Sequence, residues 1–405
     1  MGRKFTLFAI GLVLLAVGLF PGLAGQVIQA QEARPVLAFY YGWFNGGTWG
    51  DGRLADRPAE PYDSADRGAM ARQISQAQSA GIDAFVMSWY GPANGTNTAI
   101  FQGLLDQAAS QGFRVAADVD LGAAEFNATP DATLNTMRDL IANKVNHPGY
   151  YRYQGKPVIF FWNQGRFTPD QWAAIRAQVD PTHNTIWVVE GDALPYLNVF
   201  DALHLYNIAW SRNAASTAQT WAQRARQNGA LFVGTAMPGW DDTRMGRGDA
   251  AFAVDRGNGA FYRAMFSGAA SANPDMLIIT SWNEYFENTH LEPSQGLGAF
   301  YLDLTRELIA EYKGTAAVAA PEGGQLAPVP VGIAAIPQVE GLNIRQTPAT
   351  DAPILALATG GTEYPIVGRS ADGSWWLIDF GGGQGWITAS YAMYVNGDIN
   401  AVPVR

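Results

Sequence analysis

The stretch that decides the fold is residues 277–293, which read LIITSWNEYFENTHLEP. Its first part is an apolar run rich in Ile and Leu, which predicts a buried strand. The strand then opens into a polar, aromatic segment with three carboxylates, among them Glu284 and Glu287, three positions apart. A buried strand whose C-terminal end opens into Glu, Asn and Trp is typical of the acid–base site of a barrel enzyme.

Outward from this strand, short apolar runs alternate with amphipathic segments. The eight predicted strands are 36–43, 84–89, 114–118, 158–162, 185–189, 202–206, 231–235 and 276–280. Helical patterns cover 68–80, 99–111, 132–145 and 169–179, the last with Thr168 as its cap, and apolar residues recur at helical spacing over 297–308. Eight strands separated by helices predict a (β/α)8 TIM barrel. The alternative is an open doubly wound sheet, which the absence of a G-x-G-x-x-G motif after the first strand disfavours in its dinucleotide-binding form.

Several of the predicted strands end in aromatic and polar residues, and in a barrel these ends meet on one face. Aromatic rings suit the apolar C–H faces of pyranoses, while carboxylates and amides bind their hydroxyls. We therefore expect a sugar-binding cleft there. The candidate substrate-binding residues are Tyr41, Trp89, Asp118, Asp120, Tyr206, Trp240, Trp282, Asn283 and His290. The alternative is that the rings only fill the core and rim of the barrel.

Composition and charge exclude several classes of protein. The chain has 405 residues and a formal net charge of −10, so a large domain with a smaller companion is expected. An acidic chain without basic clusters is a poor candidate for binding nucleic acid or anionic membranes. It has no cysteine, which excludes disulfides and thiolate metal sites, and its four histidines lack the spacing of a zinc site. No metal and no cofactor are expected.

The first 31 residues are predicted to be a signal peptide. Arg3 and Lys4 form a basic start, residues 5–20 are apolar, and small residues follow. The apolar run is short for a membrane span, which needs about 20 residues. The remaining chain is expected to be secreted or at the cell surface, with no membrane contact after cleavage. The alternative is an uncleaved N-terminal anchor.

The C-terminal part is predicted to be a linker followed by a small β module. Residues 314–337 are rich in Ala, Pro and Gly, which predicts an extended spacer. In residues 338–400, short β-branched runs such as 364–369 and 385–388 alternate with Gly, Asp and Pro turns, which predicts a small all-β barrel. These residues closely resemble a bacterial SH3-like domain. The resemblance implies a cell-wall polymer as partner; a passive spacing module is the alternative.

The barrel segment resembles a known family. Residues 282–293, WNEYFENTHLEP, are similar to the signature loop of glycoside hydrolase family 99, the endo-α-mannosidase type. Four further stretches resemble the same family in the expected order: 39–43 (FYYGW), 82–90 (IDAFVMSWY), 147–158 (HPGYYRYQGKPV) and 238–244 (PGWDDTR). The resemblance covers nearly all of the predicted barrel domain, residues 33–313. It implies a TIM barrel that cleaves α-linked, mannan-type oligo- or polysaccharides with retention of configuration.

The resemblance also implies catalytic roles. Glu284 would deprotonate the 2-hydroxyl of the sugar, which attacks the anomeric carbon and forms an anhydro-sugar intermediate. Glu287 would protonate the leaving oxygen and then activate water. One carboxyl must then be ionised and the other protonated, so their environments must push the two pKa values apart.

Inside the loop the sequence departs from the family. Trp-His usually stands between the two Glu residues and Gly follows the second, where this chain has Tyr285, Phe286 and Asn288. Asn can take the left-handed conformation that Gly would supply, and Glu292 is expected to hold the loop. Two alternatives to a hydrolase stay open. One is a non-catalytic extracellular glycan- or cell-wall-binding protein on the same barrel, and the other is a transferase that processes glycans.

Overall fold

The computed structural model describes residues 34–123, 125–211, 213–314, 333–337, 341–350, 352–359, 361–380, 383–395, 399 and 402–405. The predicted signal peptide, 1–31, and residues 315–332 of the predicted linker lie outside them. In the part of the chain that is described, no helix is long and apolar enough to cross a membrane.

Eight parallel strands close into a barrel, as predicted. They are β1 (Val36–Tyr40), β2 (Ala84–Trp89), β3 (Arg114–Asp120), β5 (Lys156–Trp162), β6 (Ile186–Glu190), β7 (Ala202–His204), β8 (Leu231–Ala236) and β11 (Met276–Ile279). Strand β1 pairs with β2 and β11, and β3 pairs with β5, which closes the ring. All eight predicted strands are confirmed, with ends that differ by a few residues, and the doubly wound alternative is excluded.

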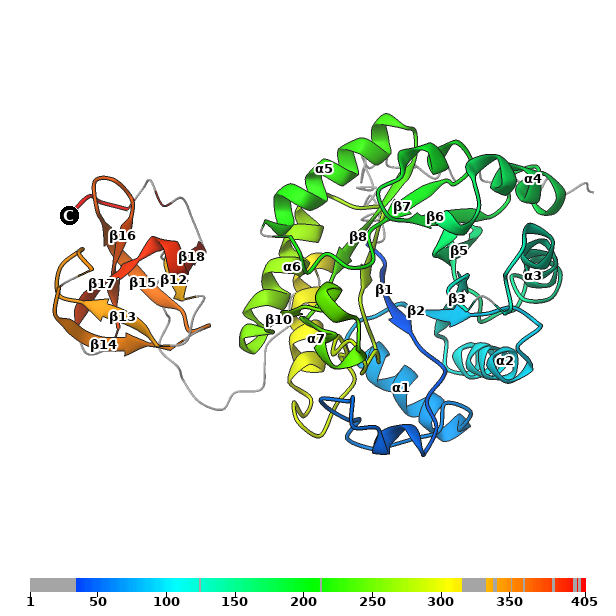
Figure 1. The fold of residues 1–405 in the computed structure, drawn as a ribbon, viewed down its shortest axis with the longest axis horizontal. Helices are drawn as coiled ribbons and strands as arrows, with labels where there is room; N and C mark the ends of the chain where they lie inside the picture. Colours follow the sequence, from blue (N-terminus) through cyan, green and yellow to red (C-terminus); the bar gives the residue numbers. More distant parts are fainter. Residues whose placement is uncertain are drawn as a thin grey trace, which may run out of the picture. The chain divides into compact units, whose positions relative to one another are not determined.

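Helices surround the strands in Figure 1. They are α1 (Arg67–Ser79), α2 (Gly95–Ser110), α3 (Pro130–Asn143), α4 (Pro169–Val179), α5 (Ala214–Gln227), α6 (Ala260–Ser271) and α7 (Phe300–Lys313). Between β6 and β7 the short 3-10 segment η3 (Leu194–Asn198) stands in place of a helix. Thr168 caps α4, as the sequence predicts. Its hydroxyl accepts a hydrogen bond from the backbone nitrogen of Gln171, and the side chain of Gln171 accepts one from the backbone nitrogen of Thr168, which completes a capping box.

Shorter elements decorate the barrel. They are the strands β4 (Arg152–Tyr153), β9 (Trp240–Asp241) and β10 (Ala253–Val254), and the 3-10 turns η1 (Thr48–Gly50), η2 (Gln164–Arg166), η4 (Thr243–Met245), η5 (Gly248–Ala250) and η6 (Gly257–Gly259). Strands β9 and β10 form a separate antiparallel ribbon after β8. This ribbon and the two turns between its strands border the face where the carboxyl ends of the barrel strands meet.

Two layers of apolar side chains form the barrel core. Because successive strand residues point to opposite faces, Phe39 and Phe160 belong to the inner cluster, while Phe85 and Trp89 belong to the outer one, between strands and helices. The same alternation decides which residues at the strand ends face the interior of the barrel.

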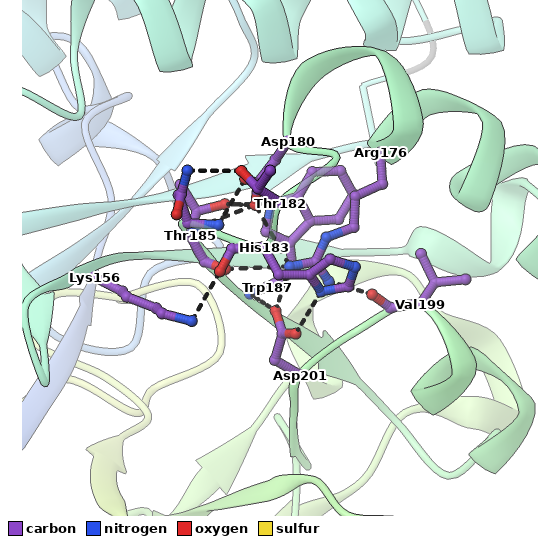
Figure 2. Close-up of polar contacts among 10 residues, drawn as sticks. Lys156, Arg176, Asp180, Thr182, His183, Thr185, Trp187, Val199 and Asp201 are labelled. Atoms are coloured by element: carbon purple, nitrogen blue, oxygen red, sulfur yellow. Dashed lines mark hydrogen bonds and ion pairs between the residues drawn. The ribbon is translucent and has the colours of Figure 1, made fainter.

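A buried ionic network lies at the opposite, N-terminal end of the strands (Figure 2). Arg176 of α4 is 3% exposed and donates to the carboxylate of Asp201 at 2.7 Å and to the carbonyl of Thr185 at 3.1 Å. Asp180 lies 3.5 Å from the same guanidinium and accepts from the hydroxyl of Thr185. These contacts tie the end of α4 to the starts of β6 and β7. At this end of a TIM barrel, such contacts serve stability rather than catalysis.

The C-terminal module is a seven-stranded antiparallel sheet, which confirms the predicted small β barrel of the SH3 type. Its strands are β12 (Ala334–Pro337), β13 (Leu342–Arg345), β14 (Ile354–Ala358), β15 (Tyr364–Arg369), β16 (Trp375–Asp379), β17 (Gln384–Thr388) and β18 (Ala392–Val395), with the turn η7 (Ala389–Tyr391). Ile344, Ile378 and Ile387 lie in its core.

One predicted boundary of this module is wrong. Residues 334–337 were expected to belong to the linker, but they form β12, which pairs with both β15 and β18. Their Ala and Pro content is typical of a spacer. Pairing with two neighbours overrides that weak local preference and buries the strand.

Candidate active site

A cavity of about 310 Å³ lies at the C-terminal ends of the barrel strands, the usual place of a barrel active site. Both predicted catalytic residues line it, together with part of the predicted substrate-binding set. These residues are Tyr41, Asp118, Asp120, Tyr206, Glu284 and Glu287. Segments far apart in the sequence therefore meet at one small, partly enclosed site.

The loop after β11 is held in place by Asn283. Its Oδ1 accepts from the backbone nitrogen of Tyr41 at 2.8 Å, and its Nδ2 donates to the carbonyl of the same residue at 2.9 Å. The backbone nitrogen of Glu284 donates to the hydroxyl of Ser281 at 2.8 Å. Asn288 has a φ of 53°, so the predicted left-handed conformation is confirmed. These bonds fix the backbone that carries both glutamates.

Glu292 anchors the other end of this loop, as predicted. Its carboxyl accepts from Gln73 at 2.7 Å and from the hydroxyls of Tyr62 and Tyr285, each at 3.1 Å. Burial raises the pKa of Glu292 to about 7. Gln73 and Tyr62 tie the loop to its surroundings, Tyr285 ties it to itself, and none of the three lines the cavity, so this third carboxyl serves the loop rather than the chemistry.

Glu284 is almost completely buried, with 4% of its surface exposed. The backbone N–H of Phe286 donates to its Oε1 at 2.9 Å. Burial raises the pKa of Glu284 well above its usual value, and the neighbouring Glu287 adds to the shift. Among the described residues no cation forms an ion pair with this carboxyl, so its environment favours the protonated form.

Glu287 has a different environment. It accepts from the guanidinium of Arg247 at 2.7 Å and from the hydroxyl of Tyr206 at 3.2 Å. Burial raises the pKa of Glu287, but Arg247 and Tyr206 oppose the shift. Arg247 also pairs with Asp242 at 2.8 Å, which fixes it beside the cavity. Two carboxyl groups of one loop thus differ in their charge partners, which is the arrangement that separates pKa values.

A short chain of hydroxyls leads to Glu287. The hydroxyls of Tyr41 and Tyr206 lie 2.5 Å apart, and Tyr206 donates onward to Glu287. Burial raises the pKa of both tyrosines well above the usual value, so both remain neutral hydrogen-bond donors. The inward-facing ends of β1 and β7 are joined in this way to the loop after β11.

Asp118 and Asp120 lie at the inner end of β3. Asp120 accepts from the hydroxyl of Ser88 at 2.8 Å and from the backbone nitrogen of Gly122 at 2.7 Å. The carboxyl of Asp118 is 6% exposed and has no hydrogen-bond partner among the described residues. Burial raises the pKa of Asp118 well above its usual value, and Asp120 and Glu190 add to the shift.

Trp89 and Trp282 were predicted to bind substrate, and the structure corrects both. Each is fully buried in the outer core, where Trp89 packs on Phe101 and Trp282 on Phe85. The physical reason is the alternation of side chains along a strand. Trp89 points toward the helices, while the next residue, Tyr90, points inward and lines the cavity.

Three other predicted substrate contacts lie outside this cavity. Asn283 is fully buried and serves the loop backbone, as described above. His290 stacks on Tyr285 with ring centroids 4.2 Å apart, and its Nε2 lies 3.3 Å from Asp56. Trp240 is 4% exposed and lines a second cavity. The structure therefore does not bring these three predicted residues to the cavity that holds the glutamates.

The cavity is completed by residues that the sequence prediction did not select. They are Trp43, Tyr90, Gly122, Ala123, Trp162, Met245, Arg247 and Phe286. Counting alternate positions along β2 and β5 would have found Tyr90 and Trp162. Arg247 lies between the turns η4 and η5, where no periodic signal exists.

A second and larger cavity, of about 420 Å³, is lined by Trp240 and Asn288, neither of which lines the first. Asp56, Arg256 and Tyr301 are among its other lining residues, and neither Glu284 nor Glu287 lines it. Size alone would rank it above the first cavity. The smaller cavity is nevertheless the candidate active site, because it alone contains the paired glutamates with unequal charge partners.

Comparison with known families gives two matches. Residues 58–312 match the model of glycosyl hydrolase family 99, and residues 340–392 match that of the bacterial SH3 domain. The first match spans more than half of the chain and includes every residue that lines the candidate active site except the two at the end of β1, Tyr41 and Trp43.

The chain is also similar to individual proteins whose names agree with this family. A mouse glycoprotein endo-α-1,2-mannosidase-like protein is 26% identical over 271 residues, which cover 60% of this chain and 59% of that protein. The rat glycoprotein endo-α-1,2-mannosidase is 25% identical over 270 residues and is covered to 58%. This chain therefore spans less than two thirds of the curated relatives that it matches.

Among solved structures, the fold resembles that of a family 99 endo-α-mannosidase from Bacteroides thetaiotaomicron. The TM-score is 0.62 at 24% identity, and the match covers 69% of this chain and 97% of that one. At this identity the likeness establishes the fold.

Proposed function

The chain belongs to glycosyl hydrolase family 99, and we propose that it is a secreted glycoside hydrolase that cleaves α-linked, mannan-type glycans with retention of configuration. The observation that carries the proposal is the convergence of Glu284 and Glu287 on one cavity among tyrosine and tryptophan rings. The printed names of the mouse and rat relatives support an α-mannosidic linkage as the substrate class.

In the proposed reaction the sugar supplies its own nucleophile. Glu284 takes the proton of the 2-hydroxyl, and the oxygen attacks the anomeric carbon as Glu287 gives a proton to the departing oxygen. Glu287 then takes a proton from water, the water opens the anhydro sugar, and Glu284 returns the proton to the 2-oxygen. Two inversions at one carbon give net retention. General acid–base assistance of this kind is typically worth roughly 10²–10⁴-fold per group.

The reaction needs a proton to change place when substrate binds. In the free site Arg247 favours ionised Glu287, while Glu284 has no cationic partner and favours the protonated state. The proposed roles require the reverse. Arg247 has 44% of its side chain exposed, so an incoming glycan can displace it from Glu287. Losing that partner raises the pKa of Glu287, which then accepts the proton that Glu284 gives up.

The test is hydrolysis of a panel of α-mannans by the full chain and by Glu284→Gln and Glu287→Gln. Newly formed reducing ends are counted and the products are sized. Glu307→Gln is a matched control, because Glu307 is half exposed and its ion-pair partner among the described residues is Arg263 at the surface. We expect both cavity variants to lose at least about 100-fold in rate and the control to keep it. Equal release of reducing ends by all four proteins would refute the proposal.

A second candidate function is non-catalytic glycan binding, and the altered loop favours it. Phe286 lines the cavity where the family resemblance leads one to expect a polar histidine. Binding of mannan without products, by wild type and variants alike, would support this candidate. Products longer than the substrate would instead support a transferase.

We further propose that the C-terminal module keeps the enzyme at a cell-wall polymer, since residues 340–392 match the bacterial SH3 family. Co-sedimentation with purified cell walls should then weaken when the chain is shortened to end at Lys313. Export is tested separately, by fractionating the producing cells and determining the N-terminus of the exported protein. Recovery of the full-length chain in the cytoplasm would contradict it.

A further inference from the structure

The side of the active-site cavity formed by β3 presents a buried carboxyl that has no hydrogen-bond partner within the described part of the chain. Asp118 is 94% buried, since only 6% of its surface is exposed, and it lines the cavity. Nothing among the described residues donates a hydrogen bond to it. A buried carboxyl is normally hydrogen-bonded or paired, so its free oxygens point to a ligand that enters the cavity.

The charged side chains that line the cavity carry an excess of negative charge, which also points to a ligand, and to a cationic one. Four carboxyl groups line it, those of Asp118, Asp120, Glu284 and Glu287, against one guanidinium, that of Arg247. Arg247 is already engaged by Glu287 and by Asp242. On the β3 side no cation of the described chain is left to pair with Asp118 and Asp120, and Glu190 adds a third carboxyl nearby.

The immediate surroundings suit a small cationic group attached to a sugar ring. Each oxygen of Asp120 accepts one hydrogen bond, from Ser88 and from Gly122, which orients the carboxyl and leaves further lone pairs free. Gly122 packs closely against this carboxyl and the ring of Trp162. A Cβ atom at position 122 would lie only 2.9 Å from Asp120 Oδ1, so a larger residue would crowd the carboxyl. Trp162 and Tyr90 line the same cavity and offer ring faces to a sugar or a cation.

We propose that the Asp118–Asp120 side of this cavity binds the ammonium group of a hexosamine unit, that is, a sugar residue with a free amino group. The glycan part rests on the proposed function, and the amino group goes beyond it. An ammonium carries three donors, so it can donate to more than one carboxylate. Burial raises the pKa of Asp118 in the empty site, and an ammonium beside the carboxyl opposes that shift and favours the ionised form.

Other occupants fit less well. A metal ion would need several ligands around one point, and no group of three or more His, Asp or Glu side chains that could hold one is found among the described residues. A neutral sugar could use Asp118 as a hydrogen-bond acceptor, but it would leave the excess of negative charge unpaired. Binding of an amino sugar should therefore depend on the charge of Asp118 and on salt more strongly than binding of a neutral sugar, so an experiment can distinguish the two.

The experiment is calorimetric titration of the full chain near neutral pH with D-mannosamine and D-glucosamine, against D-mannose, D-glucose and N-acetyl-D-glucosamine. Each titration is run in two buffers of different ionisation enthalpy, at low and at raised salt. We expect the amino sugars to bind about tenfold or more tightly than their neutral counterparts. We also expect net proton release on binding, and the preference to weaken with salt.

Variants assign the effect to this site. Asp118→Asn keeps the shape of the side chain and removes its charge. The ratio of the affinity for an amino sugar to that for its neutral counterpart should therefore fall to near one. Asp303→Asn, an exposed acid of α7, is the matched control and should keep it. Equal affinity of wild type for mannosamine and mannose would overturn the proposal, as would a preference that survives in Asp118→Asn. Neither result depends on mannan hydrolysis, so either proposal can fail while the other stands.

Discussion

Arg247 holds the carboxylate of Glu287 at 2.7 Å, whereas no ion pair among the described residues reaches Glu284. Two acids three positions apart on one loop therefore have unequal charge partners. Asp242, at 2.8 Å, keeps the guanidinium in place between the turns η4 and η5. The difference between the charge partners of Glu284 and Glu287 thus comes from a segment some 40 positions earlier in the sequence.

Arg247→Gln should shift the pH dependence of hydrolysis. Activity needs one of the two carboxyls ionised, and Arg247 lowers the pKa of Glu287 and, less strongly, that of Glu284. Without the cation the first ionisation needs a higher pH, so the acidic limb of kcat/KM should move upward by about one pH unit. Arg263→Gln, which removes an exposed pair, should leave the profile in place. An unchanged acidic limb in Arg247→Gln would show that the guanidinium does not tune the pair.

The two glutamates should respond differently to the leaving group. A substrate that releases fluoride or nitrophenolate needs little protonation, so Glu287→Gln should regain most of its lost rate of leaving-group release on such a substrate. Glu284→Gln should stay impaired, because deprotonation of the 2-hydroxyl is still required. Single-turnover rates on activated and natural substrates provide the comparison. Recovery by Glu284→Gln instead would reverse the two assignments.

Glu292 should make stability depend on pH. Burial raises its pKa from 4.5 to about 7, so the folded state keeps a proton that the unfolded chain loses. This contribution is fully present below the unfolded pKa and is lost as pH rises through the folded one. Between about pH 4.5 and 7 the free energy of unfolding should therefore fall by on the order of 3 kcal/mol from this group.

Glu292→Gln isolates that contribution. An amide can replace the hydrogen bonds to Gln73, Tyr62 and Tyr285 without titrating. Urea unfolding at several pH values should show a flatter profile for the variant than for wild type. Parallel profiles would mean that Glu292 titrates normally in the folded protein.

Arg176 should matter for stability and not for catalysis. Its removal leaves Asp180 buried without a cation and frees the carbonyls of Thr185 and Val199 (Figure 2). Arg176→Ala should lower the free energy of unfolding by about 3–5 kcal/mol, with the rate of the remaining folded protein unchanged. Arg263→Ala, at an exposed pair, should lower it by less than about 1 kcal/mol. Similar losses in the two variants would contradict this role.

The sequence by itself determined the barrel, its eight strands and the loop that carries the glutamates. Apolar runs of strand length between helical patterns have few alternatives, because a parallel barrel buries both faces of each strand. The cap at Thr168 was also readable, since capping is local chemistry. The motif at 282–293 located both carboxyls for the same reason: they lie on one short loop.

Only the tertiary structure decided which side chains meet. Trp89 and Tyr90 are neighbours in sequence, yet one packs against a helix and the other lines the cavity, because the strand alternates. Arg247 reaches Glu287 from an irregular segment, whereas no described residue forms a hydrogen bond or ion pair with the carboxyl of Asp118. Local sequence prescribes strands, helices and caps. The partner of a charged group, or the lack of one for a buried carboxyl, depends on distances between segments that no local pattern encodes.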